Sequence, residues 1–299
     1  MTGKFDAVDL SLVPAPEIID PLSFETILAD LKIDLETRDP AFTALFLESD
    51  PATKLLEVCA FRELIIRQRV NDAARATMLA HATGADLDNL AALVSIARQV
   101  IDPGNPAALP PVPATLESDD RLRTRAQLAM EGISTAGPEG AYIFHAVSAD
   151  PRVADVDVAS PVPGAVQVTI LSTDGDGTPV QALLDIVNAA LNDKNTRPLT
   201  DQVTVQAGTR IDYLITAELF LYTGPDSAIV LQSAIASITA FAAAQKKLGE
   251  PVTIDGLHKA LRVEGVRRVN LIAPVLDIQP DGAHFTNATA ITVTIGVGP

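Results

Sequence analysis

The segment LLEVCAFRELIIRQRVNDAARATML, from Leu55 to Leu79, decides how the N-terminal part of the chain folds. It contains neither glycine nor proline, the two residues that most often interrupt a helix. Just before it, Asp50 can cap a helix and Pro51 can occupy the first turn, where an N–H group is not needed. We therefore predict one long helix that begins at Pro51, continues to Thr83 and ends at Gly84.

Two apolar stripes run along this predicted helix on nearly opposite sides, with arginines on the flanks between them. A helix with two apolar stripes must be covered twice. One cover can be the chain's own helices and the other a second chain, whose carboxylates the arginines would bind. Alternatively, both covers are intramolecular, and the arginines pair with Glu57, Glu63 and Asp72 at helical spacing. The candidate interface residues are Leu55, Cys59, Ile66, Val70 and Ala73 of the first stripe, Ile65 of the second stripe (which also holds Val58, Phe61 and Leu79), and the flanking Arg62, Arg67 and Arg69.

Length and composition limit the classes of function. The 299 residues are 47% hydrophobic, which is enough for a sizeable core in one large or two ordinary domains. The 38 acids exceed the 22 bases, and this net charge of −16 argues against nucleic acid as a partner. Half of the net charge lies in residues 1–50, which hold 11 acids and three bases. We expect no internal disulfide, because Cys59 is the only cysteine, and no membrane insertion, because no run of eighteen apolar residues occurs.

The remaining chain alternates helical patterns with β-branched runs, apart from a segment with five prolines between Ile101 and Asp119. That segment can form neither a helix nor an interior strand, and we interpret it as a linker or an extended excursion. Helices are predicted at Ser23–Arg38, Asp86–Arg98, Asp119–Glu131, Gly140–Ala149, Pro179–Asn192, Asp226–Leu248 and Asp255–Arg262, and strands at Val153–Ala159, Ala165–Leu171, Val203–Gln206, Ile211–Tyr222, Val266–Ile272 and Ile291–Val297.

A weak internal repeat with an offset of 113 residues relates the two halves of this region. It aligns His145 with His258, Val153 with Val266, Val156 with Val269 and Pro161 with Pro274. Each copy would be a short helix packed across a β-hairpin, although chance similarity of two helix–strand units remains an alternative. The predicted fold class is α+β: a helical N-terminal domain (1–100), a Pro-rich linker (101–118) and two similar small α/β units with β-hairpins (119–208 and 209–299).

Candidate chemistry is sparse. No two of the four histidines have the spacing of metal ligands. Residues 174–185 begin like a calcium loop, but Pro179 stands where that loop requires glycine, so we expect a tight turn with Thr178 capping a helix and Pro179 in its first position. Asp155 and Asp157 share one face of a predicted strand and are expected to face solvent. No nucleophile elbow, phosphate loop or dinucleotide fingerprint occurs, and we predict no catalytic residue, no metal site and no cofactor.

Three long blocks carry a resemblance to a known family, and the resemblance extends from about Leu22 to Val297. The blocks resemble the baseplate assembly protein J family of contractile phage tails and phage-tail-like bacteriocins. They are ESDPATKLLEVCAFRELIIRQRVNDAARATMLAHATGADLDNLAAL (Glu48–Leu93), ESDDRLRTRAQLAMEGISTAGPEGAYIFHAVSADPRVADVDV (Glu117–Val158) and RPLTDQVTVQAG (Arg197–Gly208).

The resemblance implies a structural subunit of the baseplate wedge without enzymatic activity or cofactor. It further implies several copies around the central hub, and partners that include the chain itself, a smaller wedge protein of the I family and the sheath-initiator protein. Such a particle would be assembled in the cytoplasm of the bacterial host. Two alternatives are a soluble oligomeric adaptor outside any phage particle and a carbohydrate-binding or hydrolase module.

Overall fold

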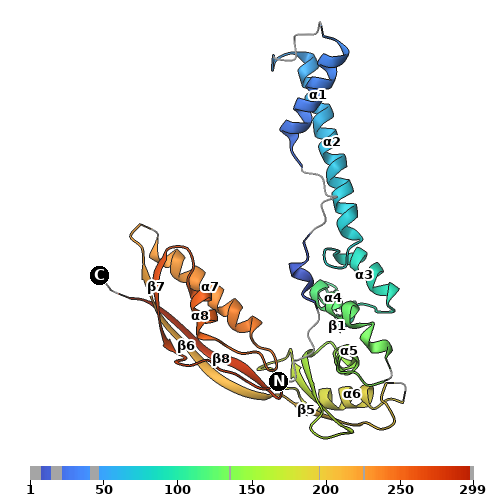
Figure 1. Cartoon of the computed structure of the whole chain (residues 1–299), viewed down its shortest axis with the longest axis vertical. Coiled ribbons are helices and arrows are strands. Elements are labelled where there is room, and N and C mark those ends of the chain that lie inside the picture. Colours follow the sequence, from blue (N-terminus) through green and yellow to red (C-terminus); the bar gives the residue numbers. More distant parts are fainter. Residues whose placement is uncertain are drawn as a thin grey trace. The chain divides into compact units, whose positions relative to one another are not determined.

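The computed structural model describes residues 8–14, 22–40, 47–134, 136–194, 196–224 and 226–296. They divide into two compact units (Figure 1). The first, here called the helical unit, comprises Val8–Arg98 and Ser118–Ala126. The second, here called the mixed unit, comprises Gln99–Glu117 and the described residues from Gln127 onward. The predicted α+β class, with helices in the N-terminal region, is confirmed.

Two antiparallel helices form most of the N-terminal part of the helical unit (Figure 1). Helix α1 (Phe24–Arg38) begins as predicted at Ser23, whose hydroxyl accepts a hydrogen bond from the Thr26 N–H (3.2 Å). Helix α2 (Pro51–Ala76) also begins as predicted, with the Asp50 carboxylate accepting from the Ala52 N–H (2.8 Å). A small core joins the two helices, and its members are Phe24, Ile27, Leu28 and Leu31 of α1 with Leu56, Ala60 and Leu64 of α2.

The predicted end of the long helix is wrong, because α2 ends at Ala76 rather than at Thr83. Arg123 supplies the physical reason: its guanidinium donates to the carbonyl oxygens of Leu79 (2.9 Å) and Ala82 (2.8 Å), and holds this segment in a turn. Gly84, expected as a terminator, instead begins helix α3 (Gly84–Leu93) with a φ of +54°.

The helices that follow α2 are held by charged groups. Helix α4 (Asp119–Leu128) starts with Asp119, whose carboxylate accepts from the Gly84 N–H (3.0 Å). The Arg98 guanidinium forms ion pairs with two carboxylates: its Nη2 lies 2.7 Å from Asp88 Oδ1 and 2.8 Å from Asp119 Oδ1. The Gly84 N–H foremost, and then Arg98, hold the pKa of Asp119 below its usual value. Short 3₁₀ turns lie at Leu10–Leu12 and Glu131–Ile133.

The proline-containing segment folds back on itself in the mixed unit. Strands β1 (Val100–Asp102) and β2 (Thr115–Leu116) pair antiparallel at its base, and Asn105 pairs with Val112 farther out. The prolines occupy the positions between and beyond these pairs, where no ladder N–H is required.

The first larger sheet has the order β3-β4-β5. Strand β3 (Val153–Ala159) runs antiparallel to β4 (Ala165–Ser172), as the predicted hairpin requires, and β5 (Gln202–Ala207) runs parallel to β4. Helices α5 (Glu139–Ala149) and α6 (Gln181–Leu191) cover it through a core that includes Tyr142, Val156, Ile170 and Val187. The predicted Thr178 cap is wrong: Val180 precedes α6 and gives no side-chain cap, while the Thr178 N–H donates to Asp176 in the preceding turn.

The second sheet has the order β7-β6-β8. Its central strand β6 (Thr209–Leu221) runs antiparallel to β7 (Val266–Ala273) and parallel to β8 (His284–Ile295). The hairpin expected here is therefore wrong, since β6 separates β7 from β8. Both larger sheets nevertheless combine one antiparallel and one parallel pair.

Helices α7 (Ser227–Ala244) and α8 (Ile254–Leu261) cover the second sheet. Helix α7 is long and apolar enough to cross a membrane by length and composition alone. In the structure it covers the sheet, with Val230, Ala234 and Ile238 buried in the core. The helix is thus part of a folded layer.

A continuous extended segment joins the two larger sheets, because only Gly208 separates β5 from β6. Leu171, Leu248 and Phe285 form a small core at this junction. The Asp155 carboxylate accepts from the Leu248 N–H across it (2.9 Å). The expectation that Asp155 faces solvent is therefore wrong, because its strand face meets the second half of the mixed unit.

Candidate assembly interface

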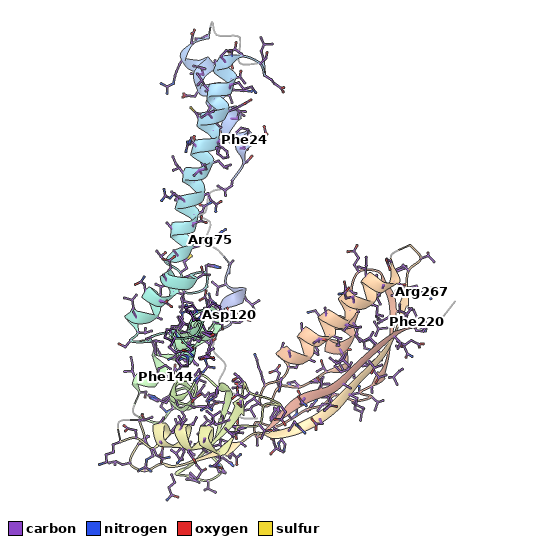
Figure 2. All side chains as sticks on the ribbon, turned by 180° about the vertical axis from the view of Figure 1, so that it is seen from behind. Phe24, Arg75, Asp120, Phe144, Phe220 and Arg267 are labelled. Atoms are coloured by element: carbon purple, nitrogen blue, oxygen red, sulfur yellow. The ribbon has the colours of Figure 1, made fainter. Side chains whose placement is uncertain are left out.

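Most apolar side chains of α2 are exposed in the part of the chain that the structure describes. Leu55 is 68% exposed, Ile66 61% and Val70 57%, although side chains of this size are usually buried. In Figure 2, α1 lies beside α2 with Phe24 against it, while side chains along the other faces of α2, as far as Arg75, point away from the rest of the unit. The described residues leave a long apolar surface uncovered here.

The covered face of α2 is a third face that the sequence analysis did not identify. It consists of Leu56, Ala60 and Leu64, which are one turn apart and contact α1. At 100° per residue the two predicted stripes are about 120° apart, rather than nearly opposite, and both lie on the side away from α1. They form one broad surface, here called the α2 arc, which consists of Leu55, Val58, Cys59, Phe61, Arg62, Ile65, Ile66, Arg69, Val70 and Ala73.

The α2 arc contains all the predicted interface residues except Arg67, and it adds Val58 and Phe61. Arg67 is half-buried beside the covered face, where its Nη2 lies 2.6 Å from Glu63 Oε1. Phe61 is 54% exposed and is the largest apolar side chain of the arc. The sequence already contained this signal, because Val58 and Phe61 belong to the second predicted stripe. Leu79 lies beyond the end of α2 and is not part of the arc.

The charges on α2 are only partly paired within the helix. Of the pairs between an arginine and Glu57, Glu63 or Asp72 that the alternative required, one occurs, between Arg67 and Glu63. Lys54 rather than an arginine binds Glu57 (3.0 Å), and Gln68 binds Asp72 (2.7 Å). These carboxylates are thereby engaged by other side chains. Arg62 and Arg69 make no ion pair with any residue that the structure describes, and both lie in the middle of the arc between its apolar sectors.

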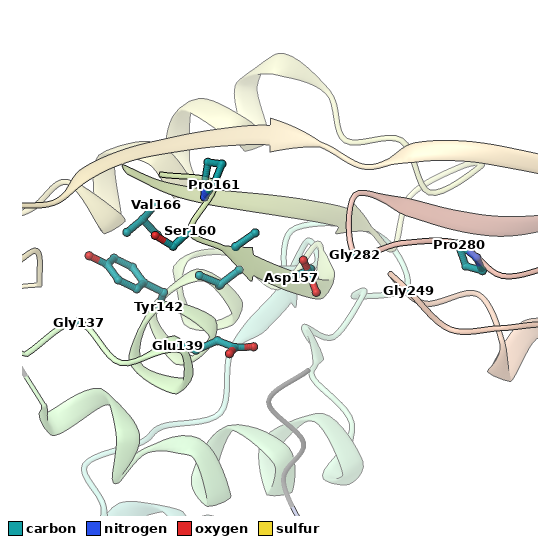
Figure 3. A pocket seen from close by; sticks show the side chains of 12 residues that line it. Gly137, Glu139, Tyr142, Asp157, Ser160, Pro161, Val166, Gly249, Pro280 and Gly282 are labelled. Atoms are coloured by element: carbon teal, nitrogen blue, oxygen red, sulfur yellow. The ribbon is translucent and has the colours of Figure 1, made fainter. Parts of the chain in front are cut away.

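The mixed unit contains a cavity of about 640 Å³, which is a second candidate site (Figure 3). Glu139, Tyr142 and Asp157 line it. The Tyr142 hydroxyl donates to Asp201 (2.8 Å), and burial raises the pKa of this phenol far above its usual value. The Asp157 carboxylate is directed at Gly282, where an added Cβ would lie 2.1 Å from Oδ2. The Tyr142 hydroxyl and the Asp157 carboxylate thus have structural contacts. Among the described residues, no cluster suited to a metal ion occurs.

Comparison with known proteins decides the family. Residues 48–105, which contain all of α2, match the Baseplate J-like N-terminal domain, and residues 134–207 match the Baseplate J-like central domain. Baseplate protein J of Escherichia phage P2 is 43% identical over 295 residues, which span 97% of this chain and 98% of that protein. The chain belongs to the Baseplate J-like family. It is a structural, non-enzymatic protein of a phage-tail or tail-like particle baseplate, as the resemblance implied.

A more distant likeness links this Baseplate J-like protein to a solved structure. One chain of the 6-fold symmetrised baseplate of the anti-feeding prophage superposes with a TM-score of 0.44 and 16% identity. The superposition covers 61% of this chain and 44% of that chain. The superposed part thus spans less than half the length of that baseplate chain.

Proposed function

We propose that this chain is a wedge subunit of a contractile-tail baseplate and that it assembles through the α2 arc. Its partners would be a second copy of the chain and the smaller wedge protein of the I family. The exposure of Leu55, Phe61, Ile66 and Val70 on one long helix is the observation that carries this proposal. Several copies would surround the central hub, contact the sheath-initiator protein and join into a ring through the C-terminal part.

The magnitudes support association through this surface. Full burial of one Val, Leu, Ile or Phe side chain stabilises a complex by about 1.5–3 kcal/mol. Leu55, Phe61, Ile66 and Val70 are 54–68% exposed in the free chain, so their burial would contribute about 4–7 kcal/mol, within the roughly 4–15 kcal/mol that association costs in lost freedom. The other members of the arc and the charge pairs of its arginines would supply the rest of the affinity.

Arg62 and Arg69, which form no ion pair with a described residue, restrict which partners fit. Burial of Arg62 or Arg69 without a carboxylate would leave a charge without compensation, which strongly disfavours the complex. A partner helix must therefore place Asp or Glu opposite the middle of the arc. Wrong partners and wrong registers lack this match, so the arginines would provide specificity.

The proposed mechanism is that of a switch scaffold with domains at 1–100, 101–118, 119–208 and 209–299. Contact of the particle tip with its target would change the contacts between wedges, and the sheath would then be released to contract. The helical part would hold each wedge together while the C-terminal parts link neighbours.

Co-expression with the smaller wedge protein, followed by light scattering, tests the proposal. Ile66→Asp should prevent assembly, because it places a carboxylate in the apolar sector of the arc. Ile33→Asp is the matched control: Ile33 on α1 is also 61% exposed, but it lies outside the arc. Circular dichroism should show unchanged folding for both variants. Assembly of Ile66→Asp at the wild-type level would exclude the arc as the interface, and equal loss in both variants would show that the effect is not specific to it.

A further inference from the structure

Strand β8 forms one edge of the second sheet. It is the outer strand of the order β7-β6-β8. The start of this edge is covered, because the Gly249 N–H donates to the His284 carbonyl oxygen (2.9 Å) and Leu248 pairs with Phe285. Farther along, from Ala290 to Ile295, no strand among the described residues pairs with the outer side of β8.

The alternation of the ladder identifies which backbone groups point outward. The Gly296 N–H donates to the Leu219 carbonyl oxygen of β6 (2.8 Å). Residues of a parallel strand alternate between its two neighbours, so residues 290, 292 and 294 also face β6. The N–H and C=O groups of Ile291, Val293 and Ile295 therefore face outward, where a further strand would bind them.

This edge lacks the features that normally prevent pairing with other chains. Natural edge strands carry charges or are short. The outer strands β7 and β3 do carry charges, namely Arg267 and Arg268 on β7 and Asp155 and Asp157 on β3. Residues 285–299 contain no Asp, Glu, Lys or Arg. The uncovered edge, the six residues from Ala290 to Ile295, carries no charge and is suited to accept a strand.

One flank of α7 extends the same uncharged surface. The Ser237 hydroxyl donates to the Ala260 carbonyl oxygen of α8 (2.7 Å), so this flank of α7 faces α8, which lies beside β7. Helix α7 itself packs on β8 (Figure 1). The opposite flank, with Leu231, Ile235 and Thr239 one turn apart, is therefore directed toward the free edge of β8. No charged residue occurs in α7.

We propose that the β8 edge accepts one extended, uncharged strand from another chain of the baseplate. Alternate side chains of that strand would be apolar and would pack under the α7 flank, while the others would lie beside Thr292 and Thr294 on the open face of the sheet. The inference rests on the proposed function, since it needs a baseplate partner.

The occupant is a single strand and not the β8 edge of a second copy. Paired strands lie about 4.8 Å apart, whereas packed helices need about 8–10 Å between their axes. Because α7 already covers β8, a second copy paired through β8 would bring its own α7 into the space of the first. An extended segment without a covering helix, such as a chain terminus or a long loop, avoids this overlap.

Hydrogen exchange tests the proposal by comparing the free chain with the same chain in purified tail or tail-like particles. Ile291, Val293 and Ile295 should exchange rapidly in the free chain and at least tenfold more slowly in the particle. Residues 290, 292 and 294 serve as internal controls, because β6 protects them in both states. Rapid exchange of the three outward amides in the particle would overturn the inference, as would their protection in a dimer of the free chain.

A pair of variants isolates the backbone contribution. Ile291→Pro removes an outward N–H without removing a bond to β6. Ile291→Ala removes the same side chain but keeps the N–H. Incorporation of Ile291→Pro into particles should be about tenfold lower than that of Ile291→Ala, with equal melting temperatures of the free chains. Equal incorporation of the two would contradict strand addition. Complete absence of the wild-type chain from particles would instead refute the proposed function.

Discussion

Arg67 is held by Glu63 one turn earlier on α2, with Arg67 Nη2 2.6 Å from Glu63 Oε1. Arg62 and Arg69, on the same helix, have no such pair among the described residues. These three arginines thus differ in role: Arg67 pairs within α2, beside the face that contacts α1, while Arg62 and Arg69 have no partner among the described residues.

Charge reversal separates these roles. Arg69→Glu should change the free energy of unfolding of the isolated chain by less than about 0.5 kcal/mol, because Arg69 is exposed and unpaired within the described chain. Assembly with the wedge partner should fall at least tenfold, measured by titration at low salt. Arg75→Glu, on the same helix but outside the arc, is the control. Equal effects of the two variants would indicate only a change in net charge.

The contact between α1 and α2 depends on a small side chain. Ala60 is fully buried there, and Ala60→Leu should destabilise the helical unit by about 1–3 kcal/mol through overpacking. Thermal unfolding and limited proteolysis of α1 would measure this. Cys59→Leu, at the neighbouring exposed position, should leave stability unchanged. A stable, protease-resistant Ala60→Leu variant would show that α1 is not anchored at this point.

Asp119 links α3 to α4, and its carboxylate should make the stability of the helical unit decrease at low pH. Since its folded pKa lies below the usual value, its stabilising contribution is present above the ordinary pKa of an aspartate and is lost as the pH falls through the lowered value. Asp119→Asn should lower stability at pH 7 by about 1 kcal/mol and flatten the loss below pH 4. Urea unfolding at pH 7 and at pH 3 provides the measurement. If Asp119→Asn lost as much stability between pH 7 and pH 3 as the wild type, Asp119 would not be the group responsible.

His145 should make the mixed unit sensitive to mild acid. Burial lowers the pKa of its imidazole, and its Nε2 lies 3.2 Å from the Gly132 carbonyl oxygen. The unfolded chain therefore binds the proton more readily, so stability is complete above about pH 6.5 and falls as the pH decreases from there. The melting temperature should decrease between pH 7 and pH 5, and His145→Gln should reduce this decrease. A rise in stability toward pH 5 would show that folding raises the pKa of His145 rather than lowering it.

Gly208 should tolerate no side chain. An added Cβ would lie 2.9 Å from Leu248 Cδ2 and 3.2 Å from Phe285 Cδ1, in the core between the two larger sheets. Gly208→Val should therefore destabilise the mixed unit by about 1–3 kcal/mol or more, measured by calorimetry. The exposed neighbour Thr209 provides the control Thr209→Val. A fully stable Gly208→Val variant would mean that the two halves can separate without loss.

Local signals predicted where elements begin. The caps at Ser23 and Asp50 and the period-2 pattern of β3 are properties of a few adjacent residues, and the structure confirms them. The end of α2 could not be predicted in the same way, because Arg123, more than forty residues later, binds the carbonyl groups that a continuing helix would use. Non-local contacts of this kind leave no periodic trace in the sequence.

The pairing of the strands could not be predicted from local sequence patterns either. The repeat around Val266 predicted a second hairpin, but β6, an earlier strand, takes the central place between β7 and β8. For the interface, the apolar stripes of α2 were visible, whereas the face that α1 covers was not. Leu56, Ala60 and Leu64 are individually unremarkable, and only the position of α1 shows which sector of α2 remains open.

The absence of a loop between β5 and β6 has a mechanical consequence. A pull on the second sheet acts along the same stretch of covalent backbone that forms an edge of the first, with Gly208 as the only intervening residue. The Asp155 bond to Leu248 and the packing of Leu171 resist bending at that point. Force applied at one sheet is thus carried to the other as tension in a single strand rather than absorbed by a slack connection.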